Sequence, residues 1–221
     1  MDGRQQGKVN YQRELDRILS GLSREGRVPR LLLHACCAPC SSYVLEYLSA
    51  YFQVTVFFYN PNIGPEAEYE KRAEELRRLI ERLPMQNRAR LELGAYEPAR
   101  FLAAVRGLEQ EPEGGRRCEA CFRLRLEEAA VLAAGEGYDY FCTTLTISPL
   151  KDAALLNRIG LELGRRYGVA YLPSDFKKRE GYKRSIQLSQ AYGLYRQDYC
   201  GCVFSKVERG RARKETETSI K

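Results

Sequence analysis

The sequence predicts an α/β fold, a parallel sheet of about five strands covered by helices, with a helical C-terminal segment. Two observations predict this class. Apolar runs of strand length recur along the chain, and stretches of helix length lie between them. Breaker sequences rich in Pro, Gly and Asn separate several of these segments. Strands that alternate with helices pair in parallel, and the helices then cover both faces of the sheet.

The N-terminal half begins with a polar arm, residues 1–28, that includes a short helix over YQRELDRILSGL. RLLLHA (30–35) is almost continuously apolar, as expected of a strand buried on both faces, and SSYVLEYLSAY supplies the next helix. QVTVFFYN (53–60) is a second strand, closed by the breaker NPNIGP. The helix after it, EAEYEKRAEELRRLIERL, is strongly amphipathic and carries acidic residues early.

The C-terminal half continues the alternation. ARLELGAY (89–96) is a third strand, followed by a short helix over EPARFLAAVRGL and a loop at 109–117. CEACFRLRLEEAAVLAA (118–134) is a helix that opens on two cysteines. YDYFCTTL (138–145) is a fourth strand, DAALLNRIGLELGRRYG is a helix, and VAYLP (169–173) is a fifth strand. In such sheets functional groups collect at the carboxyl ends of the strands.

The chain of 221 residues is long enough for one domain with a substantial core, which we expect over residues 29–205. The segment 206–221 is a basic tail that we expect to be disordered. The apolar runs are too short to cross a bilayer and no signal peptide is visible, so we expect a cytoplasmic protein without a membrane partner. The formal net charge of +7 suggests an anionic partner, of which nucleic acid is the most common, and simple solubility is the equally weighted alternative.

The cysteine content points to metal or redox chemistry. In a reducing compartment, eight cysteines indicate metal ligands or redox groups in place of structural disulfides. The chain has one histidine, His34, so any metal must be held mainly by sulfur. We expect His34 to be a hydrogen-bonded core residue, and Cys142, alone in a strand, to be a packed core thiol.

Two cysteine clusters each stand where a helix begins. The first, Cys36, Cys37 and Cys40, follows the first strand, and the second is Cys118 and Cys121. A helix N-terminus stabilises thiolates, so the clusters can converge on one metal site. The spacing allows a zinc site of Cys37, Cys40, Cys118 and Cys121. It equally allows a [4Fe–4S] cluster on Cys36, Cys37, Cys118 and Cys121. A position at the active edge of a sheet favours the reactive cluster.

The third cluster is Cys200-Gly201-Cys202. A disulfide within C-x-C needs a tight turn, which Gly201 permits, and it is strained. Strain makes such a bond labile and suited to shuttling two electrons. A second pair of metal ligands is the alternative.

The stretch before this cluster, DFKKREGYKRSIQLSQAYGLYRQDY, mixes basic and aromatic residues. Such residues read unstacked bases and phosphates in single-stranded RNA. A solvated helix face is the alternative, but proximity to Cys200 favours a nucleic-acid contact. The candidate substrate-binding residues are Lys177, Lys178, Arg179, Lys183, Arg184, Tyr195 and Arg196.

Together, HACCAPCS, RRCEACFRLRLEEAA, TTLTISPLKD, DFKKREGYKRS and LYRQDYCGCVFS resemble the QueH-type epoxyqueuosine reductases. The resemblance runs from about residue 30 to 205. It implies an oxidoreductase on a Rossmann-like or nucleotide α-hydrolase-like sheet. The implied reaction reduces the epoxide of epoxyqueuosine, at the wobble position of tRNA, to give queuosine in the last step of its biosynthesis.

The resemblance also implies site residues. The [4Fe–4S] ligands fall on Cys36, Cys37, Cys118 and Cys121, and the redox-active disulfide on Cys200 and Cys202. Cys40 is implied as a ligand of an additional mononuclear iron. The implied partners are a tRNA that carries epoxyqueuosine and an electron donor that the sequence does not identify.

Two other functions would account for part of the pattern. An ATP-using tRNA-modifying enzyme needs a glycine-rich phosphate loop after the first strand, where this chain has CCAPCSS. A zinc-stabilised, non-catalytic RNA-binding module explains four cysteines and the charge, but it leaves the Cys-Gly-Cys pair without a role.

Overall fold

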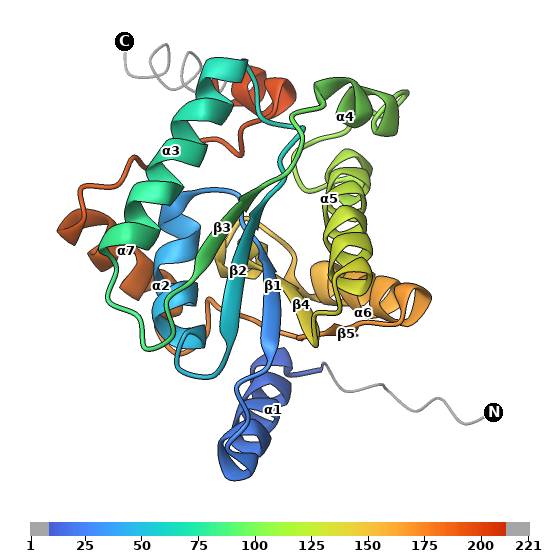
Figure 1. Ribbon diagram of the computed structural model, residues 1–221. Helices are drawn as coiled ribbons and strands as arrows, with labels where there is room; N and C mark the ends of the chain where they lie inside the picture. Colours follow the sequence, from blue (N-terminus) through green and yellow to red (C-terminus); the bar gives the residue numbers. More distant parts are fainter. Residues whose placement is uncertain (1–8, 211–221) are drawn as a thin grey trace.

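A computed structural model of the protein describes residues 9–210 (Figure 1). Its centre is a five-stranded sheet in which every pairing is parallel, which confirms the predicted α/β class. The strand order is β3-β2-β1-β4-β5. The strands are β1 Arg30–His34, β2 Gln53–Phe58, β3 Arg90–Leu93, β4 Tyr140–Thr143 and β5 Ala170–Tyr171.

Helices cover both faces of the sheet. In Figure 1, α2, α3 and α7 lie on one side and α5 and α6 on the other, with α1 at the amino-terminal edge. Residues 203–210 form a further helical segment near the carboxyl edge. The other helices are α1 Tyr11–Glu25, α2 Ala38–Leu48, α3 Glu66–Arg82, α4 Pro98–Ala104, α5 Arg116–Gly135, the short 3-10 helix η1 Thr144–Ile147, α6 Ala153–Tyr167 and α7 Gly181–Ala191.

The central strand β1 is buried on both faces, as its apolar run predicts. Leu31 and Leu33 pack into the core beneath α2 and α3, and Leu32, which points the other way, packs beneath α5 and α6. All three leucines are fully buried. Each contributes about 1.5–3 kcal/mol relative to an exposed side chain.

The strand order opens a crevice at one place. From β1 the chain crosses to β2 and β3 on one side, then returns to β4 on the other side of β1. Residues that follow β1 and β4 therefore diverge beyond the carboxyl ends of these strands, where α/β sheets bind ligands. Cys36, Cys37 and Cys40 follow β1 at this point, and η1 and the segment 148–151 follow β4.

Some predicted boundaries shift by a few residues. Helix α2 begins at Ala38, so Cys40 lies in its first turn, and α5 begins at Arg116, two residues before the predicted start. The fifth strand shortens to Ala170–Tyr171. Of the predicted tail, residues 206–210 continue the helical segment, and 211–221 lie outside the described residues. Within residues 9–210, no helix combines the length and apolar character needed to cross a membrane.

Candidate metal and redox site

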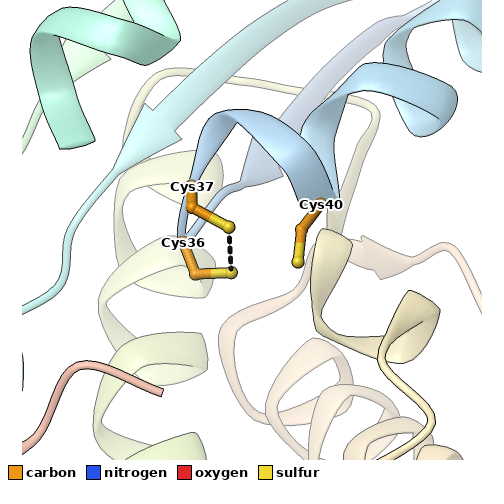
Figure 2. A group of neighbouring side chains, drawn as sticks. All are labelled: Cys36, Cys37 and Cys40. Atoms are coloured by element: carbon orange, nitrogen blue, oxygen red, sulfur yellow. Dashed lines mark hydrogen bonds between the residues drawn. The ribbon is translucent and has the colours of Figure 1, made fainter. Parts of the chain in front are cut away.

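The turn after β1 gathers three thiols (Figure 2). Cys37 caps α2 in an extended conformation, and Pro39 lies in the first turn of the helix, where its missing N–H costs nothing. The Ser41 hydroxyl donates to the Cys37 carbonyl over 2.8 Å and fixes this cap. The Sγ atoms of Cys36 and Cys37 are 3.7 Å apart. With Cys40, all three sulfurs lie within 4.8 Å of one another, close enough to share a metal ion.

His34 lies in the core beneath this turn, and both of its ring nitrogens are engaged in hydrogen bonds. Its Nε2–H donates to the Tyr59 carbonyl over 3.1 Å, and its Nδ1 accepts from the Thr143 hydroxyl at 3.0 Å. Burial lowers the pKa of His34 to about 3, so the ring is neutral at pH 7. The single histidine ties β1 to β2 and β4, as expected of a satisfied core residue.

The second cysteine cluster faces a neighbouring cavity of about 290 Å³. Cys118 lies in the first turn of α5, where its sulfur accepts the Gly114 N–H over 3.2 Å, and Cys121 lies one turn later. Cys200 and Cys202 line the same cavity. An adjoining cavity of about 310 Å³ is lined by Cys36, Cys37, Cys40 and again Cys200. Seven of the eight cysteines therefore border two cavities, four on each, with Cys200 common to both.

The eighth cysteine, Cys142, is fully buried on β4, where its thiol donates to the Leu172 carbonyl over 3.2 Å. Burial raises the pKa of its thiol to about 12, so it is an unreactive neutral thiol. Cys142 is a core residue, as the sequence predicts.

Burial and thiol–thiol hydrogen bonds set the charges of the cysteines. Hydrogen bonds with Cys37 and Cys40 hold the pKa of Cys36 well below its usual value, and the same bonds raise the pKa values of the other two. The three thiols therefore titrate as one hydrogen-bonded group, in which a negative charge on Cys36 is favoured by its two neighbours. Burial raises the pKa of Cys118, and that of Cys121 to about 11, against the expectation that the helix N-terminus favours thiolates there. Loss of water outweighs the helix dipole because both sulfurs face a largely apolar cavity.

Two cationic side chains, one buried and one half-buried, line the thiol cavities. Arg125, which is 3% exposed, donates to the Asn60 carboxamide oxygen over 2.6 Å and reaches the Cys121 sulfur at 4.0 Å. Asn60 in turn donates to the Ala35 carbonyl over 2.8 Å, which links the turn after β1 to α5. Lys151 lines both cavities, and the charges of the thiolates raise its pKa in spite of burial.

The three sulfurs after β1 fit a sulfur-ligated metal group, and Cys118 and Cys121 border the adjoining cavity. Four thiolates around a [4Fe–4S] core leave a net negative charge, which buried arginines offset. Among the described residues, the Nε–H of Arg125 has no hydrogen-bond partner although it is buried beside the cavity. An anionic sulfur of a bound group would satisfy that donor.

The Cys-Gly-Cys segment holds its two thiols close to each other, as formation of a disulfide between them requires. The Sγ atoms of Cys200 and Cys202 share a hydrogen bond across 3.6 Å, and this bond is the main cause of the low pKa of Cys200. Ser205 supports both sulfurs, since its N–H donates to Cys202 over 3.4 Å and its hydroxyl lies 3.3 Å from Cys200. Gly201 has φ +114°, a conformation that side chains disfavour.

The helical segment 203–210 holds this dithiol against α5. Arg117, buried beside Cys118, forms an ion pair of 2.5 Å with Glu208, and its guanidinium lies 4.8 Å from the centre of the Phe204 ring. Cys202 thereby packs into one apolar cluster with Cys121.

The candidate substrate-binding residues divide between two places. Arg196 borders the thiol cavity of Cys36, where its guanidinium donates to the Ser189 hydroxyl over 3.0 Å. Arg179, Lys183 and Arg184 surround a different surface hollow, where they pair with Asp16 of α1, Glu180 just before α7, and Glu46 of α2. Lys177 pairs with Asp175, Lys178 is exposed, and the Tyr195 ring stacks beneath the Lys71 ammonium of α3. The structure thus brings only Arg196 of this set to the cysteines.

Several residues at the site escaped the sequence analysis. Lys151, Arg117 and Arg72 stand among many other basic residues, and nothing in their immediate sequence shows that Arg117 and Arg72 are buried or that Lys151 lines the cavities. Arg125 had one available signal, because it lies four residues after Cys121 and so on the same face of α5.

Comparison with known proteins identifies the family. The family described as "Epoxyqueuosine reductase QueH" matches residues 31–208. The chain is 45% identical over 207 residues to a protein of that name from Staphylococcus epidermidis, covering 92% of this chain and 87% of the relative. It is 42% identical to one from Streptococcus pyogenes, covering 92% and 80%. It is 38% identical to one from Thermotoga maritima, covering 81% and 91%. The chain therefore belongs to the QueH family of epoxyqueuosine reductases, a family of oxidoreductases.

Proposed function

We propose that this protein reduces the epoxide of epoxyqueuosine, at the wobble position of a tRNA, to the alkene of queuosine, in the last step of queuosine biosynthesis in the cytoplasm. The observation that carries the proposal is the placement of Cys200. Its thiol belongs to a closely spaced pair and also borders the cavity of the Cys36, Cys37 and Cys40 cluster. A two-electron store therefore lies beside a candidate metal centre.

The electrons and atoms of the reaction balance on this pair. Removal of the epoxide oxygen as water requires two electrons and two protons. Oxidation of Cys200 and Cys202 to a disulfide forms the S–S bond and releases two electrons and two protons. One substrate is reduced for each pair oxidised, and an external dithiol or another electron donor must reduce the disulfide before the next turnover.

In this proposal Cys36, Cys37, Cys118 and Cys121 would hold a [4Fe–4S] cluster, and Cys40 would bind an additional mononuclear iron. When bound, such a group supplies single-electron transfer, and an iron with an open position polarises the epoxide oxygen. The chain prepares the site with Arg125 and Lys151, whose charges favour thiolates over thiols. Lys151, on the wall between the two cavities, offers a hydrogen-bond donor to an oxygen that enters either one.

The cavity next to Cys36 is the place we propose for the modified nucleoside. Tyr182, Arg196 and Tyr199 line it together with Cys36 and Cys40. Arg and Tyr side chains are suited to hold an unstacked base and its phosphates. We propose that the exposed cations of the α7 region contact the tRNA backbone farther from the cavity.

The salt dependence of tRNA binding tests this surface. We expect the triple variant Lys178→Gln, Lys183→Gln, Arg184→Gln to bind tRNA more weakly. In a plot of log affinity against log salt concentration, the negative slope should decrease in magnitude by about 0.7–0.9 for each phosphate that the variant no longer neutralises. A matched triple variant, Arg123→Gln, Arg158→Gln, Arg165→Gln, neutralises three cations of α5 and α6 on the opposite face of the sheet. Equal slopes for the two triple variants, measured by filter binding, would remove the α7 region from the proposed interface.

A single-turnover experiment tests the function. Protein purified without oxygen, reduced and freed of reductant, is mixed with tRNA that carries epoxyqueuosine. We expect queuosine to appear in a one-to-one ratio with Cys200–Cys202 pairs oxidised, as counted by thiol alkylation and mass spectrometry. Iron and acid-labile sulfide are assayed in the same sample. A colourless protein that binds one zinc, even after anaerobic cluster reconstitution, and makes no queuosine would instead support a zinc-stabilised RNA-binding module.

A further inference from the structure

The Cys200–Cys202 segment contacts α3, a helix that contains no cysteine. Arg72 of α3 is 1% exposed, although an arginine side chain is costly to bury. Its Nη1–H donates to the Cys200 carbonyl over 3.2 Å, and its guanidinium lies 5.3 Å from the centre of the Tyr199 ring. Glu68, one turn earlier, aligns the guanidinium by accepting from its Nε–H over 2.7 Å.

The contact with Arg72 is tight at the glycine between the two cysteines. A Cβ atom at Gly201 would lie 3.1 Å from Nη1 of Arg72 and 2.9 Å from Cγ1 of Ile63. The Gly64 N–H also donates to the Gly201 carbonyl over 3.1 Å. The turn is therefore enclosed by α3 on one side and by the loop before α3 on the other.

The same helix contacts the segment that leads into the turn. Glu75 accepts the Tyr195 N–H over 2.6 Å, and the Lys71 ammonium lies 3.5 Å from the centre of the Tyr195 ring. Arg82 reaches the Tyr192 carbonyl at 3.4 Å. Helix α3 thus aligns residues 192–201, and Arg72 is its most buried contact, placed directly at the dithiol.

We propose that Arg72 is a positioning residue for the Cys200–Cys202 pair, which Glu68 assists. The guanidinium holds the backbone turn in the conformation that keeps the two sulfurs 3.6 Å apart. Such pre-organisation raises the effective concentration of one thiol at the other, and this favours closure of the disulfide. The inference rests on the redox role proposed above for the pair.

The test measures the equilibrium between the pair and a glutathione redox buffer. In this exchange, oxidised glutathione is reduced to two glutathione molecules as the Cys200–Cys202 disulfide forms. The full-length protein, isolated without oxygen with its bound metal, is equilibrated in buffers of varying ratio, quenched with acid, alkylated and digested with trypsin. Cleavage after Arg196 and Lys206 releases a peptide, residues 197–206, whose only cysteines are Cys200 and Cys202. Its mass therefore reports this pair alone.

We expect Arg72→Met to lower the equilibrium constant for disulfide formation by about tenfold, which is a shift of about 30 mV for a two-electron couple. Arg72→Lys, which keeps the charge but has no planar fork, should recover part of the loss. The control is Arg78→Met on the same helix, which breaks a matched but exposed i,i+4 pair with Glu74 and should leave the constant unchanged.

Thermal unfolding of each variant separates positioning from general stability, because a merely structural arginine would lower the melting temperature without moving the equilibrium constant. An unchanged constant in folded Arg72→Met overturns the positioning role and leaves the redox pair intact. A wild-type protein whose peptide 197–206 never acquires the disulfide, in any buffer, overturns the redox role of the pair and this inference with it.

Discussion

Replacement of Cys121 by serine is expected to abolish iron binding and activity together. Serine is a poor ligand for iron because its hydroxyl is hard and stays protonated at neutral pH, whereas a thiolate is soft. Changes to groups that only support metal ligands already cost about 10–100-fold in affinity, so loss of a ligand should cost more. We expect iron affinity after anaerobic reconstitution to fall by at least about a hundredfold, with queuosine formation below detection. Cys37→Ser should behave in the same way, because Cys37 is another ligand of the same proposed cluster and borders the adjoining cavity.

The matched control for these variants is Cys142→Ala. This thiol is buried, like Cys121, but it lies on β4 away from both cavities, and its loss leaves the iron sites untouched. We expect wild-type iron content and activity, with a stability loss of about 1 kcal/mol from the missing hydrogen bond and small cavity. If Cys121→Ser retained a full complement of iron and sulfide, α5 would not supply a ligand and the proposed cluster would be wrong.

Replacement of Cys200 or Cys202 by serine is expected to separate metal binding from turnover. Neither residue belongs to the proposed ligand set, so the visible spectrum and the iron content should match those of the wild type. A single serine prevents the disulfide and removes the two-electron store. The steady-state rate of queuosine formation with an added dithiol reductant should therefore fall by at least about a hundredfold. This corresponds to an increase of nearly 3 kcal/mol in the activation free energy.

Two measurements keep this expectation specific. Ser205→Ala removes a hydroxyl that lies 3.3 Å from Cys200 but leaves both thiols, so it should reduce turnover only modestly. Repeated turnover by both serine variants would show that electrons reach the substrate by another route. A loss of iron from either variant would instead assign these cysteines to the metal site, the alternative that the C-x-C spacing leaves open.

Much of the architecture could be predicted from local pattern because it depends on local physics. The run around Leu31, Leu32 and Leu33 identifies a strand buried on both faces, since a strand that is solvated on one face would alternate with polar residues. The predicted strands, their parallel pairing and the intervening helices are confirmed. The groups of closely spaced cysteines also show, without coordinates, that thiol chemistry is concentrated at few places.

The residues between and around the thiols depend on contacts between distant segments, so the tertiary structure alone reveals them. The strand order places the loop after β4, with Lys151, opposite the turn after β1, and sequence periodicity carries no information about this order. Arg72 contacts Cys200, which is 128 residues away, and Arg117 contacts Glu208, which is 91 residues away. Burial of a charged side chain is decided by what packs against it, and in the sequence these arginines look like solvated helix residues. Folding converts them into buried cations, and these align the Cys-Gly-Cys turn and hold it against α5.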